Sequence, residues 1–295
     1  MRHTNSSYTV TILGGDYRQY LLYQDFVKRG ISVSGIALQT SFPTQKLYAQ
    51  SIENEQTLLP SDIYITGFPF TKDHMHIYAE NKGYLITLDY FFQHLKQHPP
   101  KMLIGGQFPQ KVLDFCRDYQ IPCHDLLKCD SLAIANAIPT AEGAIYYAMG
   151  LSPITLHKSN CLVLGFGKCA KPLAAKLKGL DANVTVCARK KTDLAQIASC
   201  GYTPLSLEQL DTKLYQFSFI FNTIPAMILN RSRIATLSSN VAIVDIASVP
   251  GGIAQDAAKE FDIPFKHALG IPGKLSPKTA ADILAEQILL LLAAL

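Results

Sequence analysis

The chain has 295 residues, of which 48% are hydrophobic and 17% are charged, so it is not a mainly disordered protein. This length favours two domains. The chain has 27 Lys and Arg residues against 23 Asp and Glu residues, so it lacks the basic excess typical of a nucleic-acid binder. The seven cysteines include no C-x-x-C pair, so we expect no metal site, no disulfide framework and a reducing, cytoplasmic setting.

Neither end of the sequence predicts a membrane segment. The first seven residues are polar, unlike a secretory signal. The apolar run over Ile288–Leu295 is eight residues long, far short of the roughly 20 that cross a bilayer. We expect this run in a core or interface helix, with a membrane-surface role as the alternative.

In the first half, strand-sized apolar runs alternate with helix-sized stretches, which is typical of a parallel α/β fold. The predicted strands are Tyr8–Leu13, Ile31–Ala37, Asp62–Thr66, Gly83–Thr87 and Met102–Ile104. The predicted helices are Tyr17–Arg29, Tyr90–Gln97 and Lys111–Tyr119.

A junction follows the first half. Pro139 is suited to open a helix over Thr140–Met149, with Glu142 in its first turn. Gly150 then favours the end of that helix. We therefore place the boundary of the first domain at residue 150.

The second half repeats the alternation. The predicted strands are Asn160–Leu164, Asn183–Ala188, Phe217–Phe221, Val241–Ile246 and Pro264–His267. The predicted helices are Lys168–Lys178, Thr192–Cys200 and Pro277–Leu292. We expect the last of these helices to pack back on the first domain.

A glycine-rich turn follows the strand Asn160–Leu164. It reads Gly165-Phe166-Gly167-Lys168-Cys169-Ala170 and opens the next helix. Gly165 allows the tight turn, Gly167 lets the backbone approach a pyrophosphate, and Ala170 lets the helix pack closely on the strand. The context of strand, turn and helix predicts a dinucleotide site, the alternative being a glycine turn that binds nothing.

The end of the second strand of this half predicts which dinucleotide binds. An NAD-specific domain usually carries an acidic residue there, but this chain has Ala188 followed by Arg189, Lys190 and Lys191. Arg189 is suited to grip a 2′-phosphate with two N–H groups, and Thr192 adds a hydroxyl. We expect NADP, the alternative being a solvated basic turn beside a loosely held NAD.

The opening strand leads into Gly14-Gly15-Asp16, which lacks the second spaced glycine of a dinucleotide loop. A second dinucleotide here is not expected. The two glycines favour close approach of the backbone to a substrate, with Arg18 available for a carboxylate. In the alternative interpretation this is a structural turn in which Asp16 caps the following helix.

Several motifs, taken together and in order, resemble one family. They are the Gly14–Gln19 turn, Asn136–Ala144, the glycine loop, Asn222–Pro225, Asp245–Gly252, Gly270–Gly273 and Ser276–Ala280. The sequence is similar in these segments to the family of dipicolinate synthase A subunits. The resemblance covers nearly the whole chain, although residues 68–84 have no motif that aligns by eye.

This resemblance implies an α/β protein of two Rossmann-like domains with parallel sheets. The first, 1–150 completed by 277–295, is then the substrate domain, and 151–276 is the NADP-binding domain. The family implies NADP-dependent oxidation of dihydrodipicolinate to dipicolinate, on a branch of the lysine pathway, in the cytoplasm of the mother cell of a sporulating bacterium. It also implies a flavoprotein-like partner, the dipicolinate synthase B subunit. A homo-oligomer is expected, with neither nucleic acid nor membrane as a partner.

The expected chemistry assigns roles to residues. The inferred substrate is a small cyclic dicarboxylate, so its binders are cationic or hydroxyl side chains: Arg18, Thr140, Ser248, Lys274, Ser276, Lys278 and Thr279. The expected cofactor-binding residues are Gly165–Cys169, Ala188–Lys190, Thr192, Asn222, Thr223, Ile224, Pro225, Asp245 and Gly270. Glu142, His267 and solvent remain candidates for the proton acceptor.

Two other functions stay open. One is a different two-domain dehydrogenase acting on an amino acid, a shikimate-like acid or a folate. The other is a non-catalytic NADP-binding subunit that activates a partner.

Overall fold

The structure is a computed structural model that describes residues 8–41, 58–81, 83 and 85–295. The polar stretch of residues 1–7, considered above for a signal, lies outside this part. The chain divides into two compact units, Met1–Ala133 with Ser276–Leu295, and Ile134–Leu275. The sequence placed the boundary at 150, whereas the fold divides near the start of a long helix.

The first unit is built on a five-stranded parallel sheet. Its strands lie in the order β2-β1-β3-β4-β5. Their bounds are β1 Val10–Leu13, β2 Val33–Ile36, β3 Ile63–Ile65, β4 Met102–Gly105 and β5 Cys123–Asp125. This is the flavodoxin-like order, in which the chain reverses direction across the sheet between β1 and β3.

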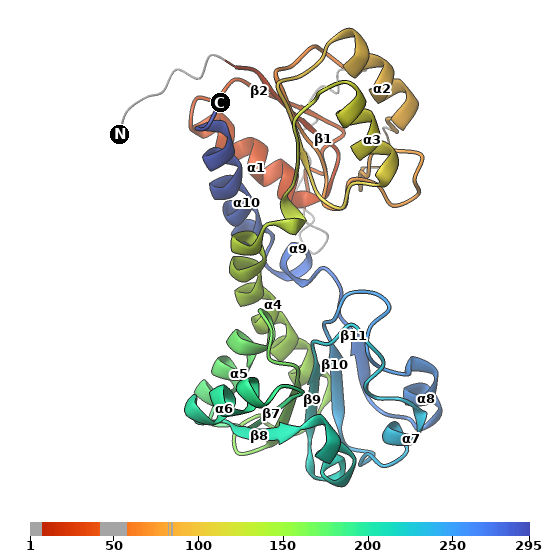
Figure 1. The fold of residues 1–295 in the computed structure, drawn as a ribbon, viewed down its shortest axis with the longest axis vertical. Helices are drawn as coiled ribbons and strands as arrows, with labels where there is room; N and C mark the ends of the chain where they lie inside the picture. The colour runs from red at the N-terminus through yellow and green to blue at the C-terminus, as the bar shows by residue number, and fades with distance from the viewer. Residues whose placement is uncertain (1–7, 42–57, 82, 84) are drawn as a thin grey trace. The chain divides into compact units, whose positions relative to one another are not determined.

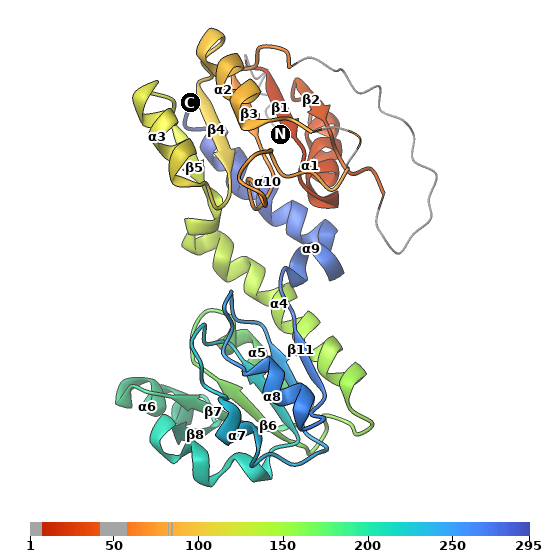
Figure 2. The ribbon, with the colours of Figure 1, turned by 90° about the vertical axis from the view of Figure 1, so that its right-hand side faces the viewer.

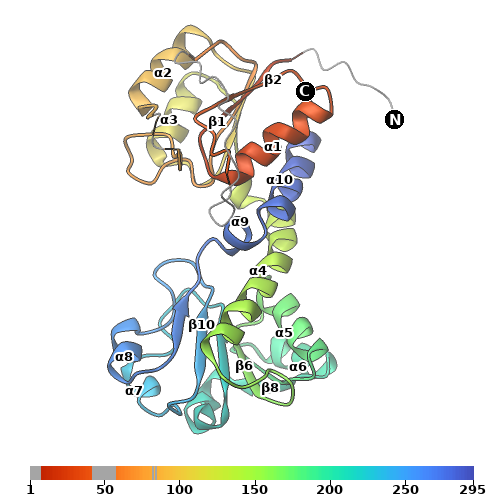
Figure 3. The same cartoon turned by 180° about the vertical axis from the view of Figure 1, so that it is seen from behind.

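Four helices cover the two faces of this sheet. Helices α2 (Leu88–Gln97) and α3 (Gln110–Asp118) pack on one face around Phe91 and Val112 (Figure 2). Helices α1 (Tyr17–Lys28) and α10 (Pro277–Leu292) lie side by side on the other (Figure 3). The predicted return of the C-terminal helix to the N-terminal domain is thereby confirmed, because Leu284 and Ile288 of α10 are buried with Phe26 of α1.

The second unit is built on a six-stranded parallel sheet in the order β8-β7-β6-β9-β10-β11 (Figure 1). Its strands are β6 Asn160–Leu164, β7 Asn183–Ala188, β8 Thr203–Ser206, β9 Phe219–Asn222, β10 Ala242–Asp245 and β11 Phe265–His267. The order corresponds to 3-2-1-4-5-6 of a dinucleotide-binding Rossmann sheet, with its switch point between β6 and β9. The predicted α/β fold with two parallel-sheet domains is confirmed.

Alternate side chains of these strands face two separate helix layers. Val163 and Phe221 point to the layer that contains α4, α5 and α6, and Leu164 and Ile220 point to the layer that contains α7 and α8. The helices are α4 Asp130–Leu151, α5 Ala170–Gly179, α6 Lys191–Ser199, α7 Arg231–Ile234 and α8 Gln255–Glu260. A short helix, α9 (Ile271–Leu275), ends the unit.

The junction helix differs from its prediction. Helix α4 begins at Asp130, so Pro139 lies inside it and Glu142 is in its interior rather than in its first turn. Proline removes one backbone hydrogen bond from a helix. The buried alanines 137, 141, 144 and 148 show that packing holds the helix despite this loss.

The predicted strand Gly83–Thr87 is wrong. Thr87 forms only an isolated antiparallel bridge with His76 and serves as the N-cap of α2. Tyr84 lies outside the described residues. Strands β5 and β8 were missed because both are short, and because Pro204 argues against a strand except at a sheet edge, where β8 lies.

Among the described residues no helix is long and apolar enough to cross a membrane.

Candidate dinucleotide site and substrate pocket

The switch point of the second sheet brings the glycine loop beside the end of β9. Thr223 follows β9, and its hydroxyl donates to the carbonyl oxygen of Leu164 at 2.8 Å. Gly165 has a φ of +102°, and a Cβ there would lie 2.4 Å from Thr223 Oγ1. Only glycine fits this turn.

Gly167 is different because a Cβ at this position would meet nothing within 4 Å. The protein itself therefore does not require glycine here, whereas a phosphate approaching the backbone does. Helix α5 begins just beyond, and its N-cap residue Cys169 makes no side-chain capping bond. In the first turn of α5 the N–H of Lys171 donates to the carbonyl oxygen of Gly167 at 3.2 Å, and Pro172 has no N–H. The open backbone at Gly167 and the positive end of the helix dipole, rather than a row of free N–H groups, therefore make this cradle fit a dinucleotide pyrophosphate.

The basic residues after β7 face solvent. Ala188 is buried at the end of the strand, while Arg189, Lys190 and Thr192 are exposed. Lys190 is the N-cap of α6 and makes no side-chain capping bond. The end of β7 thus has no acidic side chain between Ala188 and Thr192 to repel a phosphate.

Asn222 and Asp245 end the neighbouring strands β9 and β10, and both are fully buried. Asn222 Nδ2 donates to Asp245 Oδ1 at 2.8 Å. The carboxylate also accepts from the backbone N–H of Ala247 at 3.0 Å and of Gly252 at 2.9 Å. Three internal donors therefore use Asp245, which holds the loop after β10 in place.

His267 holds the same loop from β11. Its Nε2 lies 3.1 Å from the carbonyl oxygen of Ala247, which requires Nε2 to be the donor. Its Nδ1 lies 3.3 Å from the side-chain nitrogen of Gln255 and is then the acceptor. Both ring nitrogens are engaged, which favours a positioning role over proton acceptance.

The remaining second-unit candidates lie on or near the surface. Ser248, Pro225 and Gly270 are exposed, as is Lys274, and Ile224 is half-buried. Phe166 of the glycine loop is half-buried, with Lys171 Nζ 4.9 Å from the centre of its ring.

The two junction-helix candidates both have partners on the protein. Thr140 Oγ1 donates to the carbonyl oxygen of Asn136 at 2.7 Å. Glu142 forms an ion pair with Lys176 of α5 at 2.8 Å. Glu142 therefore ties α4 to α5 in addition to any part it takes in the reaction.

In the first unit, Asp16 caps α1 in a reciprocal capping box with Gln19, so the capping interpretation of this turn is confirmed. Arg18 also binds Asp16 with two hydrogen bonds, from Nε at 2.8 Å and from Nη2 at 2.7 Å. Nη2 donates as well to the carbonyl oxygen of Phe68 at 3.0 Å. Arg18 thus uses two of its three side-chain nitrogens in hydrogen bonds that connect the loop after β1 with the loop after β3.

The last candidates open α10. Lys278 pairs with Asp282 one turn along the helix and is exposed, as is Thr279. Ser276 is the N-cap residue but makes no side-chain capping bond.

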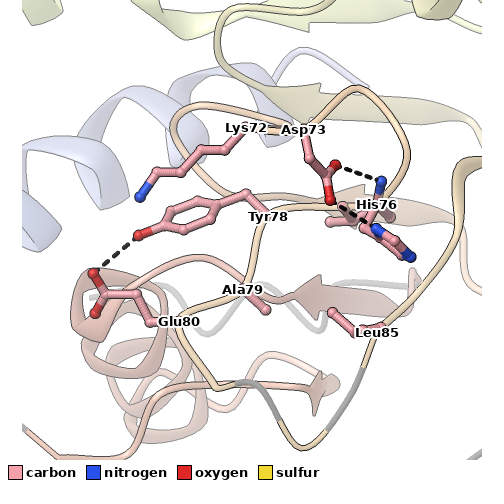
Figure 4. A pocket seen from close by; sticks show the side chains of 8 residues that line it. Lys72, Asp73, His76, Tyr78, Ala79, Glu80 and Leu85 are labelled. Atoms are coloured by element: carbon pink, nitrogen blue, oxygen red, sulfur yellow. Dashed lines mark hydrogen bonds and ion pairs between the residues drawn. The ribbon is translucent and has the colours of Figure 1, made fainter.

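The first unit also contains a pocket of about 400 Å³ that no motif indicated (Figure 4). It is formed by the segment that follows β3 and pairs with the turn after β1, where Gly15 bridges Ala79. Its lining residues are Lys72, Asp73, His76, Ile77, Tyr78, Ala79, Glu80 and Leu85. The segment lacks alternating hydrophobicity and glycine spacing, so only the folded chain brings these side chains together.

Comparison with known proteins gives a consistent result for both units. Residues 9–127 match the family model of the N-terminal domain of the dipicolinate synthase A subunit. The dipicolinate synthase A subunit of Bacillus subtilis (strain 168) is 38% identical over 168 residues, which span 57% of this chain and 57% of that protein. The crystal structure of the dipicolinate synthase A chain from Bacillus subtilis has a TM-score of 0.84 and 27% identity, covering 97% of this chain and 96% of that one.

The chain resembles the A subunit of dipicolinate synthase over nearly its whole length. The apo structure of D-lactate dehydrogenase from Escherichia coli has a TM-score of 0.66 at 15% identity and covers 96% of this chain and 95% of that one. At that identity the likeness concerns the fold alone. The resemblance anticipated from the scattered sequence motifs is therefore confirmed.

Proposed function

We propose that the chain is the A subunit of a dipicolinate synthase and oxidises dihydrodipicolinate to dipicolinate with NADP. The observation that carries this proposal is the full-length likeness to the Bacillus subtilis dipicolinate synthase A chain, at 27% identity and a TM-score of 0.84. The open cradle at Gly167 supports the nucleotide part, because the protein itself places nothing within 4 Å of a Cβ at that position.

When bound, NADP supplies a hydride acceptor. The chain's own residues bind and orient the reactants, which is enough for a large part of the rate in a reaction that ends in an aromatic ring. Thr223 lies on the ribose side of the proposed nucleotide site. Asn222 was expected there too, but its side chain is fully buried and bonded to Asp245 and Ile224, so it acts through the Asp245 network, which holds the loop that carries Ser248. Ser248, Lys274 and Thr140 are the proposed carboxylate contacts of the second unit, and Arg18 and Lys278 those of the first.

The choice of NADP over NAD rests on Arg189. Its guanidinium is exposed after the end of β7, where an NAD enzyme usually has a carboxylate. Bidentate N–H bonds from Arg to a phosphate are strong and geometrically specific. Lys190 and Thr192 add a charge and a hydroxyl at the same helix start.

The wider assignment follows from the same likeness. We propose that the chain works with a B subunit, assembles with further copies of itself, and supplies dipicolinate in the cytoplasm of the mother cell during sporulation. The Bacillus subtilis relative is named as one subunit of a synthase, which supports the existence of a partner.

The test supplies aspartate semialdehyde and pyruvate to a dihydrodipicolinate-forming enzyme and follows dipicolinate by ultraviolet absorbance after this protein is added. Parallel samples contain NADP or NAD, with or without the B subunit. We expect faster formation than in the protein-free control, with NADP preferred. Product only when the B subunit is present would make the chain an obligate half of the enzyme, and no product in any sample would refute the proposal.

A further inference from the structure

The pocket of the first unit lies at a position where α/β sheets bind ligands. It is formed by the loop after β3, which pairs through Ala79 with the turn after β1. β1 and β3 flank the point at which the strand order reverses, and ligands bind outside the carboxyl ends of strands at such points. Its volume of about 400 Å³ falls within the usual range for small-molecule sites.

One side of the pocket presents the ammonium of Lys72, an exposed residue. Lys72 Nζ lies 3.7 Å from the centre of the Tyr78 ring, a cation–π contact. The Tyr78 hydroxyl donates to Glu80 Oε1 at 3.0 Å. Burial and the neighbouring Glu80 carboxylate raise the pKa of Tyr78, so the phenol stays neutral and continues to donate.

The other side holds an imidazole beside a carboxylate. His76 Nδ1 lies 2.7 Å from Asp73 Oδ2. The backbone N–H groups of Met75 and His76 each donate to Asp73 Oδ1 at 2.9 Å. These bonds fix the carboxylate and favour a proton on Nδ1. Nε2, which Asp73 does not use, donates to a ligand when the ring is the doubly protonated imidazolium, the form that a carboxylate on Nε2 requires.

Apolar side chains lie between the two ends. Figure 4 shows the ammonium of Lys72 and the imidazole of His76 on opposite sides, with Ala79 and Leu85 between them. The Glu80 carboxylate interacts electrostatically with the guanidinium of Arg18. This positive charge offsets part of the repulsion between Glu80 and a bound anionic ligand. The pocket therefore combines an apolar surface with nitrogen donors at both ends.

We propose that this pocket binds the flat ring of a cyclic dicarboxylate, with one carboxylate at Lys72 Nζ and the other at His76 Nε2. The ring would lie against Ala79 and Leu85. This inference rests on the proposed function for the identity of the ligand, and it assigns substrate and product binding to a segment that none of the motifs covered. Lys72 and His76 then join Arg18 among the substrate-binding residues of the first unit.

The test uses the full chain without NADP and measures binding of dipicolinate by calorimetry, with picolinate, which has one carboxylate, as the comparison ligand. We expect dipicolinate to bind about tenfold or more tightly than picolinate, because only the dicarboxylate has one carboxylate for each of the two nitrogens. Absence of dipicolinate binding to the wild-type chain, or equal affinity for the two ligands, would overturn the proposal.

Three variants locate the site. Lys72→Met keeps the apolar contact with Tyr78, and it should weaken dipicolinate binding about tenfold while leaving picolinate less affected. His76→Asn should act in the same direction. His74→Asn is the matched control, because His74 is exposed two residues away with a φ of +63°, which asparagine accepts.

Thermal unfolding of each variant checks the fold. Wild-type affinity for dipicolinate in correctly folded Lys72→Met and His76→Asn would refute this site. The turnover assay of the proposed function is read separately on the wild-type chain. If the wild-type chain turns over substrate but Lys72→Met and His76→Asn bind dipicolinate with wild-type affinity, the pocket proposal alone is refuted. If dipicolinate binding depends on Lys72 and His76 but no turnover occurs, the proposed reaction is refuted and the pocket stays assigned.

Discussion

Asn222 Nδ2 and Asp245 Oδ1 lie 2.8 Å apart, in two fully buried side chains at the ends of neighbouring strands. The carboxylate also accepts the N–H groups of Ala247 and Gly252. One buried charge therefore joins β9, β10 and the loop after β10. Because all these partners are internal, Asp245 fixes the backbone beside the proposed nucleotide site and need not contact a nucleotide itself.

Replacing Asp245 with Asn should destabilise the second unit. The new amide has one acceptor oxygen instead of two, so it leaves a buried N–H of Ala247 or Gly252 without its partner, at a cost of about 1–3 kcal/mol. Urea unfolding measures the change. Asp262→Asn is the control, since Asp262 is exposed with a φ of +53° that asparagine tolerates, and equal stabilities of the two variants would contradict this account.

Gly167→Ala should separate folding from nucleotide binding. A methyl group at this position has room, so the melting temperature should stay close to that of the wild type, while NADP affinity falls by about tenfold or more because the methyl blocks the pyrophosphate. Gly179→Ala at the end of α5 also has room for a methyl and should change neither property. Fluorescence titration with NADPH measures the affinity, and undiminished binding in Gly167→Ala would exclude this loop as the phosphate cradle.

Arg189→Ala should raise the KM for NADP by about tenfold to a hundredfold, because the variant loses the charge-assisted hydrogen bonds to the 2′-phosphate, whose binding free energy corresponds to a change of this size. The KM for NAD, which has no 2′-phosphate, should hardly change. Steady-state kinetics with both nucleotides give the ratio, and Lys213→Ala, at an exposed lysine of the same unit, controls for net charge. A parallel loss with NAD and NADP would argue against Arg189 as the 2′-phosphate contact.

Asp62→Asn should lower the free energy of unfolding near neutral pH but not in acid. The backbone N–H of Thr9, at 2.8 Å, and then Lys101 lower the pKa of Asp62. A lowered pKa contributes stability above the unfolded value of about 3.9, and this stability is lost as pH falls through the folded value. Unfolding curves of wild type and variant should therefore converge in acid; a constant gap across the pH range would speak against the ion pair.

Much of the fold could be predicted from sequence because buried parallel strands form continuous apolar runs. Asn160–Leu164 and Asn183–Ala188 were placed at their observed bounds, and Pro277–Leu292 was recognised as the helix that returns to the first domain. The short strands β5 and β8 have too few residues to show a period. The sequence predicts a helix that begins only after Pro139, whereas α4 begins at Asp130. Local helix propensity does not show that packing of the buried alanines of α4 offsets the hydrogen bond lost at Pro139.

The site could be predicted only where local spacing carries the chemistry. Gly165 and Gly167 can be recognised from sequence because the whole strand, turn and helix motif lies in one continuous segment. The pairing of Asn222 with Asp245 joins strand ends that are 23 residues apart, and that of Arg18 with Phe68 joins loops 50 residues apart. Such pairs depend on strand order, as does the assembly of Lys72 and His76 around Tyr78.

The most direct measurement compares dipicolinate formed with NADPH formed in one sample that contains the chain, the B subunit, NADP and freshly generated dihydrodipicolinate. The account predicts that both products appear together in a ratio of about one to one, because oxidation to the aromatic ring transfers one hydride. It also predicts that Gly167→Ala lowers both rates equally. Dipicolinate that accumulates without NADPH, or at the rate of the protein-free control, would contradict the central claim that this chain is an NADP-dependent oxidoreductase.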